Sequence, residues 1–197
     1  MIEVEKNFDI SPSDKERLIK ESQFLGKKVF TDIYYDTTDY RLTRKDRWLR
    51  QRNNKWELKI PFAQKDANER ITDQYYELEN EKEIAKALEI NFTESFSEAV
   101  KRSGFFPLAT ITTTRETYQK EDFRIDFDEM DFGFSALEVE LLVVSESEVP
   151  LAEKRILEFA KNHGLKDNKV RAKVIEYLFR NNLDHYNMLV ATGIIKE

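Results

Sequence analysis

The amino-acid sequence predicts an α+β fold, namely an eight-stranded antiparallel β-barrel with flanking helices. Segments rich in aromatic and β-branched residues, or alternating apolar with charged residues, recur about eight times along the chain. Segments with helical spacing and capping residues lie between or after them. A length of 197 residues suits one well-cored domain, so we expect residues 1–197 to form a single domain.

The first strand is expected over Ile2–Phe8, because apolar and polar residues alternate there. Ser11 and Pro12 then provide a cap and a first-turn proline, and Gly26 occupies a natural position just beyond a helix end. These signals predict a helix over residues 12–25.

Two turns and one long connection organise the remaining strands. The pair 53–54 is Asn-Asn, which tolerates the positive φ of a tight hairpin turn, and a second turn is expected at 131–133. The segment Pro61–Gln74 is polar and without periodicity, so we interpret it as a lid. The other strands are expected over Val29–Asp36, Arg47–Arg52, Lys55–Ile60, Gln74–Leu78, Ala109–Gln119, Phe123–Asp128 and Ala136–Val144.

The remaining helices are predicted from caps and spacing. Asn80 with Glu83 resembles a capping box, and Gly104 closes a helical pattern over Thr93–Ser103. The end of the chain is helical in pattern over Pro150–His163, Val170–Arg180 and a last piece around His185–Ala191.

Composition and charge exclude several classes of function. A net charge of −6 and a pI near 5.3 argue against binding to nucleic acid or to an anionic membrane. Apolar runs fall far short of the roughly 20 residues that a membrane-spanning helix requires. The absence of cysteine removes disulfides and thiolate metal sites, and Met1 leads into a strand pattern rather than a signal peptide. We expect a monomeric cytoplasmic protein.

Charged residues recur two positions apart on several strands, so each pair shares one face of the sheet. A single pair would usually face water. In a closed barrel covered by helices on its apolar side, however, the charged faces point inward. An interior that holds carboxylates and cations together requires a polyanionic ligand with a metal such as Mg²⁺ or Mn²⁺. The pairs are Glu3 and Glu5, Arg50 and Arg52, Glu57 and Lys59, Asp126 and Asp128, and Glu138 and Glu140.

Six motifs resemble those of the CYTH, or triphosphate tunnel metalloenzyme, family. They are I-E-V-E-K-N-F at the start, Y-Y-D-T at 34–37, W-L-R-Q-R at 48–52, W-E-L-K at 56–59, R-I-D-F-D at 124–128 and L-E-V-E at 137–140. D-F-G-F at 131–134 and R-A-K-V-I-E-Y-L at 171–178 extend the resemblance over nearly the whole chain. It implies a tunnel that hydrolyses the terminal phosphate of a small-molecule triphosphate with Mg²⁺.

The resemblance also implies roles for individual residues. The metal would be held by Glu3, Glu5, Asp126, Glu138 and Glu140. The phosphates would be bound by Arg50, Arg52, Lys59, Arg115 and Lys173, with Glu77 as a further carboxylate of the tunnel.

Three aromatic or basic residues carry the expected chemistry. Tyr34 and Lys59 match a dyad that activates the attacking water, since a buried lysine can have a depressed pKa and serve as a base. Trp48 matches an aromatic residue that would stack on a cationic thiazolium ring, which favours thiamine triphosphate as the substrate. Inorganic tripolyphosphate, a nucleoside triphosphate and cyclisation of ATP remain alternatives.

One position departs from the family signature, which places a lysine where this chain has Asn7. A bulge could bring the neighbouring Lys6 inward, but plain loss of one phosphate contact is the favoured interpretation. This loss motivates a further alternative, a non-catalytic module that binds polyphosphate. His163 and His185 have no partner at metal-binding spacing, so we expect both at the surface.

Overall fold

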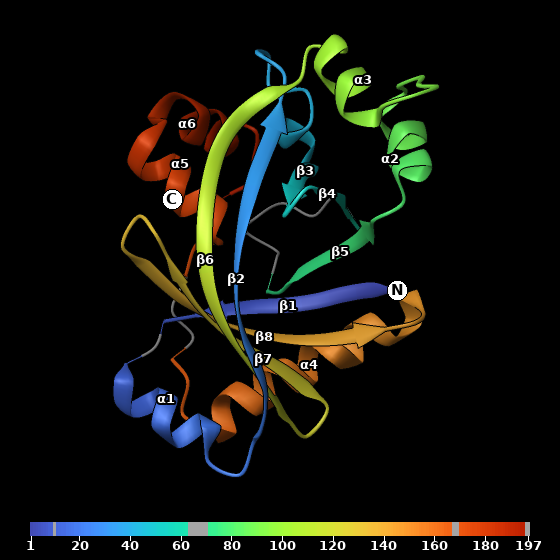
Figure 1. Cartoon of the computed structure of the whole chain (residues 1–197). Coiled ribbons are helices and arrows are strands. Elements are labelled where there is room, and N and C mark those ends of the chain that lie inside the picture. The colour runs from blue at the N-terminus through green and yellow to red at the C-terminus, as the bar shows by residue number, and fades with distance from the viewer. Residues whose placement is uncertain (10, 63–70, 167–169, 196–197) are drawn as a thin grey trace.

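Eight strands close into an antiparallel barrel in the order β1-β5-β4-β3-β2-β6-β7-β8, which confirms the predicted fold (Figure 1). The computed structural model describes residues 1–9, 11–62, 71–166 and 170–195. The strands are β1 (Ile2–Phe8), β2 (Gln23–Asp36), β3 (Trp48–Arg52), β4 (Lys55–Pro61), β5 (Asp73–Leu78), β6 (Phe106–Lys120), β7 (Phe123–Met130) and β8 (Phe134–Val143).

Helices pack around the outside of the barrel in three groups (Figure 1). Two of them, α1 and α4, pack against β1, β7 and β8, while α2 and α3 cover β3 and β4. The third group, α5 and α6, lies beside β6 and β8. Their bounds are α1 (Pro12–Ile19), α2 (Glu81–Leu88), α3 (Phe96–Arg102), α4 (Val149–Asn162), α5 (Lys173–Asn181) and α6 (Leu183–Ala191), with 3₁₀ turns η1 (Thr43–Lys45) and η2 (Glu146–Glu148).

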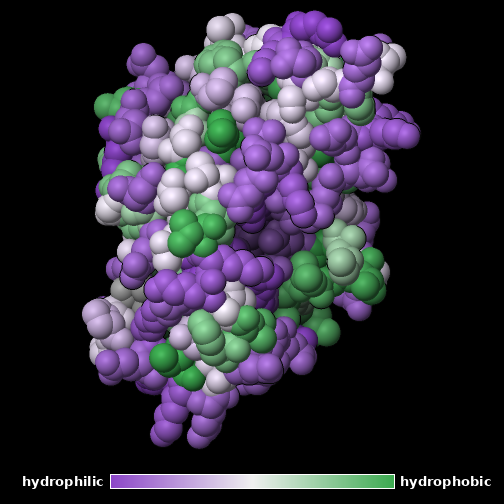
Figure 2. Space-filling model, in the orientation of Figure 1, coloured by the Kyte–Doolittle hydropathy of each residue, from purple (hydrophilic) through white to green (hydrophobic). Residues whose placement is uncertain are grey.

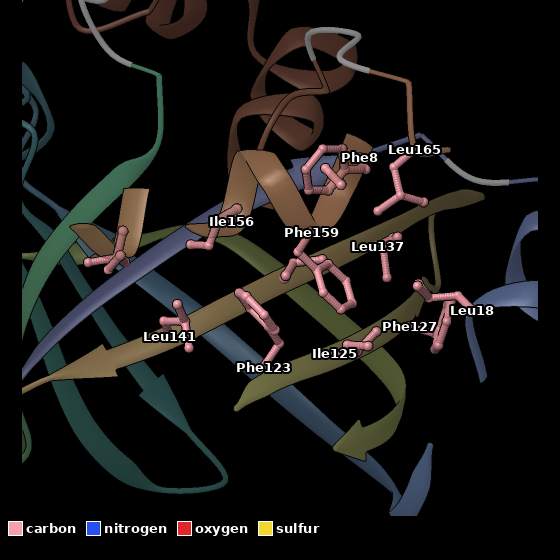
Figure 3. Packing of buried hydrophobic residues seen from close by; sticks show 14 of the residues in the cluster. Phe8, Leu18, Phe123, Ile125, Phe127, Leu137, Leu141, Ile156, Phe159 and Leu165 are labelled. Atoms are coloured by element: carbon pink, nitrogen blue, oxygen red, sulfur yellow. The ribbon is translucent and has the colours of Figure 1, made fainter. Parts of the chain in front are cut away.

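The apolar faces of the strands point outward to these helices. Figure 3 shows Ile156 and Phe159 of α4 directed at the outer face of the barrel, where Ile125 and Leu137 are also fully buried. Burying each such side chain stabilises the fold by about 1.5–3 kcal/mol. Because the core lies outside the barrel, the opposite face of every strand is left for the interior.

The helix predicted over residues 12–25 is wrong at its end. It stops at Ile19, Glu21 adopts a positive φ of 61°, and β2 already begins at Gln23. Gly26 is therefore not a helix terminator: it lies in β2, where the pairing with β6 shifts register between Phe24 and Gly26. Pairing with the long strand β6 overrides the local helix signal.

The predicted turns are present. Asn53 and Asn54 have φ of 46° and 68°, as a type I′ hairpin requires, and Gly133 has a φ of 76° in the turn after β7. Asn80 caps α2, and Ser95 caps α3. The predicted lid, Pro61–Gln74, falls for the most part on residues 63–70, which lie outside the described part of the chain.

Candidate active site

The barrel encloses a cavity of about 980 Å³ whose wall carries most of the charged pairs predicted from the sequence. Figure 2 shows hydrophilic residues surrounding a hollow in the middle of one face. The lining includes Glu3, Glu5, Tyr34, Trp48, Arg50, Arg52, Lys59, Glu77, Arg115, Glu138, Glu140 and Lys173. Each strand contributes alternate residues, since successive side chains point to opposite faces.

Three carboxylates from two neighbouring strands form an acidic cluster. Oxygen atoms of Glu3, Glu138 and Glu140 all lie within 4.8 Å of one another. Burial, together with the charges of Glu3 and Glu138, raises the pKa of Glu140 to about 8. Crowded, buried carboxylate oxygens of this kind suit a hard divalent cation, whose charge would offset their repulsion. The donor set therefore fits Mg²⁺ or Mn²⁺.

Lys59 bridges the acidic cluster to Glu5. Its amine lies 2.5 Å from Glu3 and 3.1 Å from Glu5. Burial lowers the pKa of Lys59, but Glu5 and Glu3 outweigh that effect and hold it well above its usual range. This is opposite to the depressed pKa expected for a general base, so Lys59 is a cation in the ligand-free protein.

Tyr34 lies on the same inner surface, but β3 separates its strand from that of Lys59. Its register partner is Arg50. Burial and the nearby Asp32 raise the pKa of the Tyr34 phenol to about 12, so the hydroxyl stays protonated and can donate a hydrogen bond.

A buried aspartate, Asp32, joins three of the predicted phosphate-binding cations. It is fully buried and lies 2.7 Å from Arg52, 2.5 Å from Lys173 and 3.9 Å from Arg50. Despite burial, these cations hold the pKa of Asp32 well below its usual range. The sequence interpretation missed it, although alternation places Asp32 on the same strand face as Tyr34.

Arg50 also contacts the carboxylates of β4 and β5. Its guanidinium lies 2.6 Å from Glu57 and 3.0 Å from Glu77. Glu77 thus lines the wall of the cavity, and Glu57 joins it as a partner that was not assigned a role. An arginine held on one side by carboxylates keeps other N–H donors for a ligand.

Arg115 occupies the centre of a second set of carboxylates. It contacts Asp128 through two bonds of 2.6 Å, and it lies 2.5 Å from Asp126 and 3.3 Å from Glu138. Asp126 also accepts bonds from Thr117 and Arg124. Asp126 is therefore bound to cations here, and it lies outside the cluster of Glu3, Glu138 and Glu140.

Trp48 forms part of the cavity wall and is 7% exposed. Its indole nitrogen donates a 2.9 Å hydrogen bond to Asp46, which fixes the orientation of the ring. The other tryptophan, Trp56, packs in the outer core beneath α3.

The bulge considered for Lys6 is not formed. The pairing of β1 with β8 runs without a register shift, and Asn7 faces Glu138 in this ladder. The Lys6 amine donates a 3.0 Å hydrogen bond to the backbone oxygen of Ile71. Asn7 lines the cavity at the position where the family signature has lysine, and Lys6 lines the same cavity.

The surface position expected for His185 is wrong. His185 is completely buried, its Nε2 lies 2.7 Å from the Thr43 hydroxyl, and its ring stacks on Tyr40. It joins α6 to the loop before β3. Sequence spacing could not reveal this, because the partner is 142 residues away in the chain.

The closed barrel and its lining define a tunnel protein with a densely charged interior. The chain belongs to the CYTH family, since the CYTH domain matches residues 1–174. It is 31% identical to human thiamine-triphosphatase over 215 residues, covering all of this chain and 93% of the relative. The Macaca fascicularis enzyme is 32% identical with the same coverage. These relatives support a triphosphatase enzyme.

Solved structures share the fold. The PH1819 protein of Pyrococcus horikoshii superposes with a TM-score of 0.69 at 21% identity, covering 91% of this chain and 99% of that protein. HpAC1 of Hippeastrum, described with a dominant triphosphatase activity, has a TM-score of 0.55 at 19% identity and covers 91% and 94%. Within the described residues, no helix is long and apolar enough to cross a membrane.

Proposed function

We propose that this protein hydrolyses thiamine triphosphate to thiamine diphosphate and phosphate with Mg²⁺ inside the barrel. The observation that carries the proposal is the cavity itself, where a cluster of three carboxylates lies close to buried arginine and lysine side chains. Trp48, in the wall of the cavity, supplies an aromatic face for the organic group of thiamine triphosphate. The similarity to two thiamine-triphosphatases supports this substrate.

Different residues of the cavity would bind the cation and the phosphates. Glu3, Glu138 and Glu140 would hold the cation, which when bound would neutralise phosphate charge and acidify water. Glu5 and Asp126, next to this cluster, would complete the carboxylate wall. The triphosphate oxygens would be bound by Arg50, Arg52, Arg115 and Lys173.

Lys59 and Tyr34 would act on the attacking water. The Lys59 amine is positively charged while it forms ion pairs with the carboxylates of Glu3 and Glu5. With Glu3 among the ligands that would hold the cation, Lys59 would keep Glu5 as its carboxylate partner. The pKa of Lys59 would then lie lower than in the protein without cation, because burial would be opposed by fewer carboxylates, and a neutral amine can accept a proton. The neutral phenol of Tyr34 would hydrogen-bond to the water or the terminal phosphate.

The direct experiment measures phosphate release from thiamine triphosphate, tripolyphosphate and ATP, with Mg²⁺, with Mn²⁺ and with a chelator. We expect thiamine triphosphate to be preferred and the chelator to abolish release. Preference for tripolyphosphate or ATP would favour one of these substrates, the alternatives left open by the sequence. Tight binding without release from any substrate would instead identify a binding module, the alternative motivated by Asn7.

Trp48→Ala should weaken selection of the organic group. We expect kcat/KM for thiamine triphosphate to fall by about tenfold more than that for tripolyphosphate, because a cation–π contact is lost. Trp56→Phe is the matched control, since Trp56 lies in the outer core. Equal effects of Trp48→Ala on both substrates would contradict the role.

The pH dependence of kcat/KM should report the titration of the Lys173 amine. Burial and the neighbouring arginines lower the pKa of Lys173 to about 8, against the attraction of Asp32. Below that pH the amine is charged and can bind phosphate, and above it the amine is neutral. At saturating Mg²⁺, kcat/KM should therefore decline as the pH rises through about 8. Lys173→Arg, which stays charged, should remove this decline. Its persistence in that variant would assign it to another group.

A further inference from the structure

The loop between β2 and β3 holds a buried aspartate at the wall of the cavity. Asp46 is 2% exposed and lines the cavity. It ends η1 with a φ of 57°, and its N–H bonds to the Thr43 oxygen. Asp36 accepts backbone bonds from Thr37, Leu42 and Thr43 in the same loop. The backbone that carries Asp46 is therefore tightly held.

One oxygen of Asp46 connects two aromatic side chains. It accepts a 2.9 Å hydrogen bond from the Trp48 indole and another of 2.9 Å from the Tyr75 hydroxyl. Trp48 begins β3 and Tyr75 lies on β5, and these strands are separated by β4. The carboxylate thus spans two strands that do not pair, and it orients both rings in the wall of the cavity.

The two rings share an apolar side of the cavity, while the Lys59 amine lies 5.4 Å from the centre of the Tyr75 ring. Trp48 and Tyr75 pack in one cluster with Met130, Ile194 and Ile195, and all five side chains line the cavity. An apolar wall that contains a carboxylate repels phosphate and favours a group that is both organic and positively charged. A hydrogen bond from the indole to a carboxylate also raises electron density on the ring, which strengthens its attraction for a cation.

We propose that Asp46 is a specificity-determining residue that positions Trp48 and Tyr75 around the cationic, organic end of the substrate. This inference rests on the proposed function, because it takes a thiamine-like ring as that end. Asp46 does not act on the reacting phosphate. Its effect should therefore appear in the choice between an organic triphosphate and inorganic tripolyphosphate, which lacks the organic group.

The test compares kcat/KM for thiamine triphosphate with that for tripolyphosphate in Asp46→Asn, Asp46→Ala and Tyr75→Phe. The amide of Asp46→Asn keeps the acceptor but loses the charge, so the ratio should fall about fivefold. Asp46→Ala loses both bonds, and the ratio should fall about tenfold. In Tyr75→Phe one bond is lost and the ring remains, so we expect a fall of about threefold.

Thermal unfolding of each variant, measured together with the ratio of kcat/KM values, separates this role from a structural one. A general loosening of the loop would lower hydrolysis of both substrates together and leave their ratio unchanged. The matched control is Asp122→Asn, which removes a charge from an exposed pair with Arg155. It should leave the ratio at the wild-type value.

Three outcomes would overturn the inference, and they are distinguishable from one another. If both Asp46 variants keep the wild-type ratio within about twofold while Trp48→Ala lowers it, Asp46 has no part in selection and the proposed function stands. If wild-type protein does not hydrolyse thiamine triphosphate, the proposed function fails and the inference fails with it. Should the Asp46 variants not fold, an unchanged ratio in Tyr75→Phe overturns the inference.

Discussion

Glu138→Gln is expected to lower Mg²⁺-dependent phosphate release by about a thousandfold and to raise the Mg²⁺ concentration needed for half-maximal activity. Burial opposes ionisation of Glu138, but Arg115, Lys59 and Lys173 outweigh it and lower its pKa to about 2. Glu138 therefore contributes a full negative charge to the acidic cluster at neutral pH. The glutamine keeps the shape of the side chain and removes that charge.

Steady-state rates measured over a Mg²⁺ titration check this expectation. Glu129→Gln is the control, because Glu129 lies on the adjacent strand β7 but is exposed to solvent. Both variants remove one negative charge from the protein, so a difference between them reports the position of the charge. An unchanged Mg²⁺ requirement in Glu138→Gln would exclude Glu138 from the cation site.

Arg115→Met should lower the free energy of unfolding by about 3–5 kcal/mol near neutral pH and abolish hydrolysis. The change leaves Asp126, Asp128 and Glu138 buried together without the guanidinium that contacts all three. Removing one partner of a buried ion pair is costly because the remaining charges stay desolvated. Urea denaturation of the variant and the wild type measures the difference.

The same variant should recover part of its stability as the pH falls. Without Arg115, Asp126 and Glu138 lose a neighbouring charge that lowers their pKa values, so the folded variant binds protons earlier on acidification. The difference in free energy of unfolding between the wild type and the variant should decrease as the pH falls from about 7 to about 5. Arg155→Met, in an exposed pair with Asp122, should cost under about 1 kcal/mol. A gap that is independent of pH would contradict this electrostatic explanation.

The alternation of residues predicts the strands and the side of each strand that carries charge, because a pleated strand has a fixed period of two. It does not predict which charges meet. Arg115 is three strands away from Glu5 in the closed sheet, and only closure brings their strands to one cavity. The contacts of Lys59, and hence its raised pKa, depend on the strand order, because Glu3 and Glu5 lie on β1, two strands away from β4.

The residues that sequence analysis missed share a physical cause. Asp32 has no charged residue two positions away in the chain, Asp46 lies in a loop, and His185 lies in a helix with many apolar neighbours. Each becomes distinctive only through contacts with residues that are distant along the chain. The early end of α1 has the same origin, since the competing strand pairing is made with β6.

The sharing of Asp32 among Arg50, Arg52 and Lys173 has a consequence for how this protein can diverge. Groups that contact one common partner do not contribute independently, so the effects of substitutions at these positions should not add. A change at one cation alters the balance of charge for the other two. New substrate preferences at this wall therefore require coordinated replacements rather than a series of independent single steps.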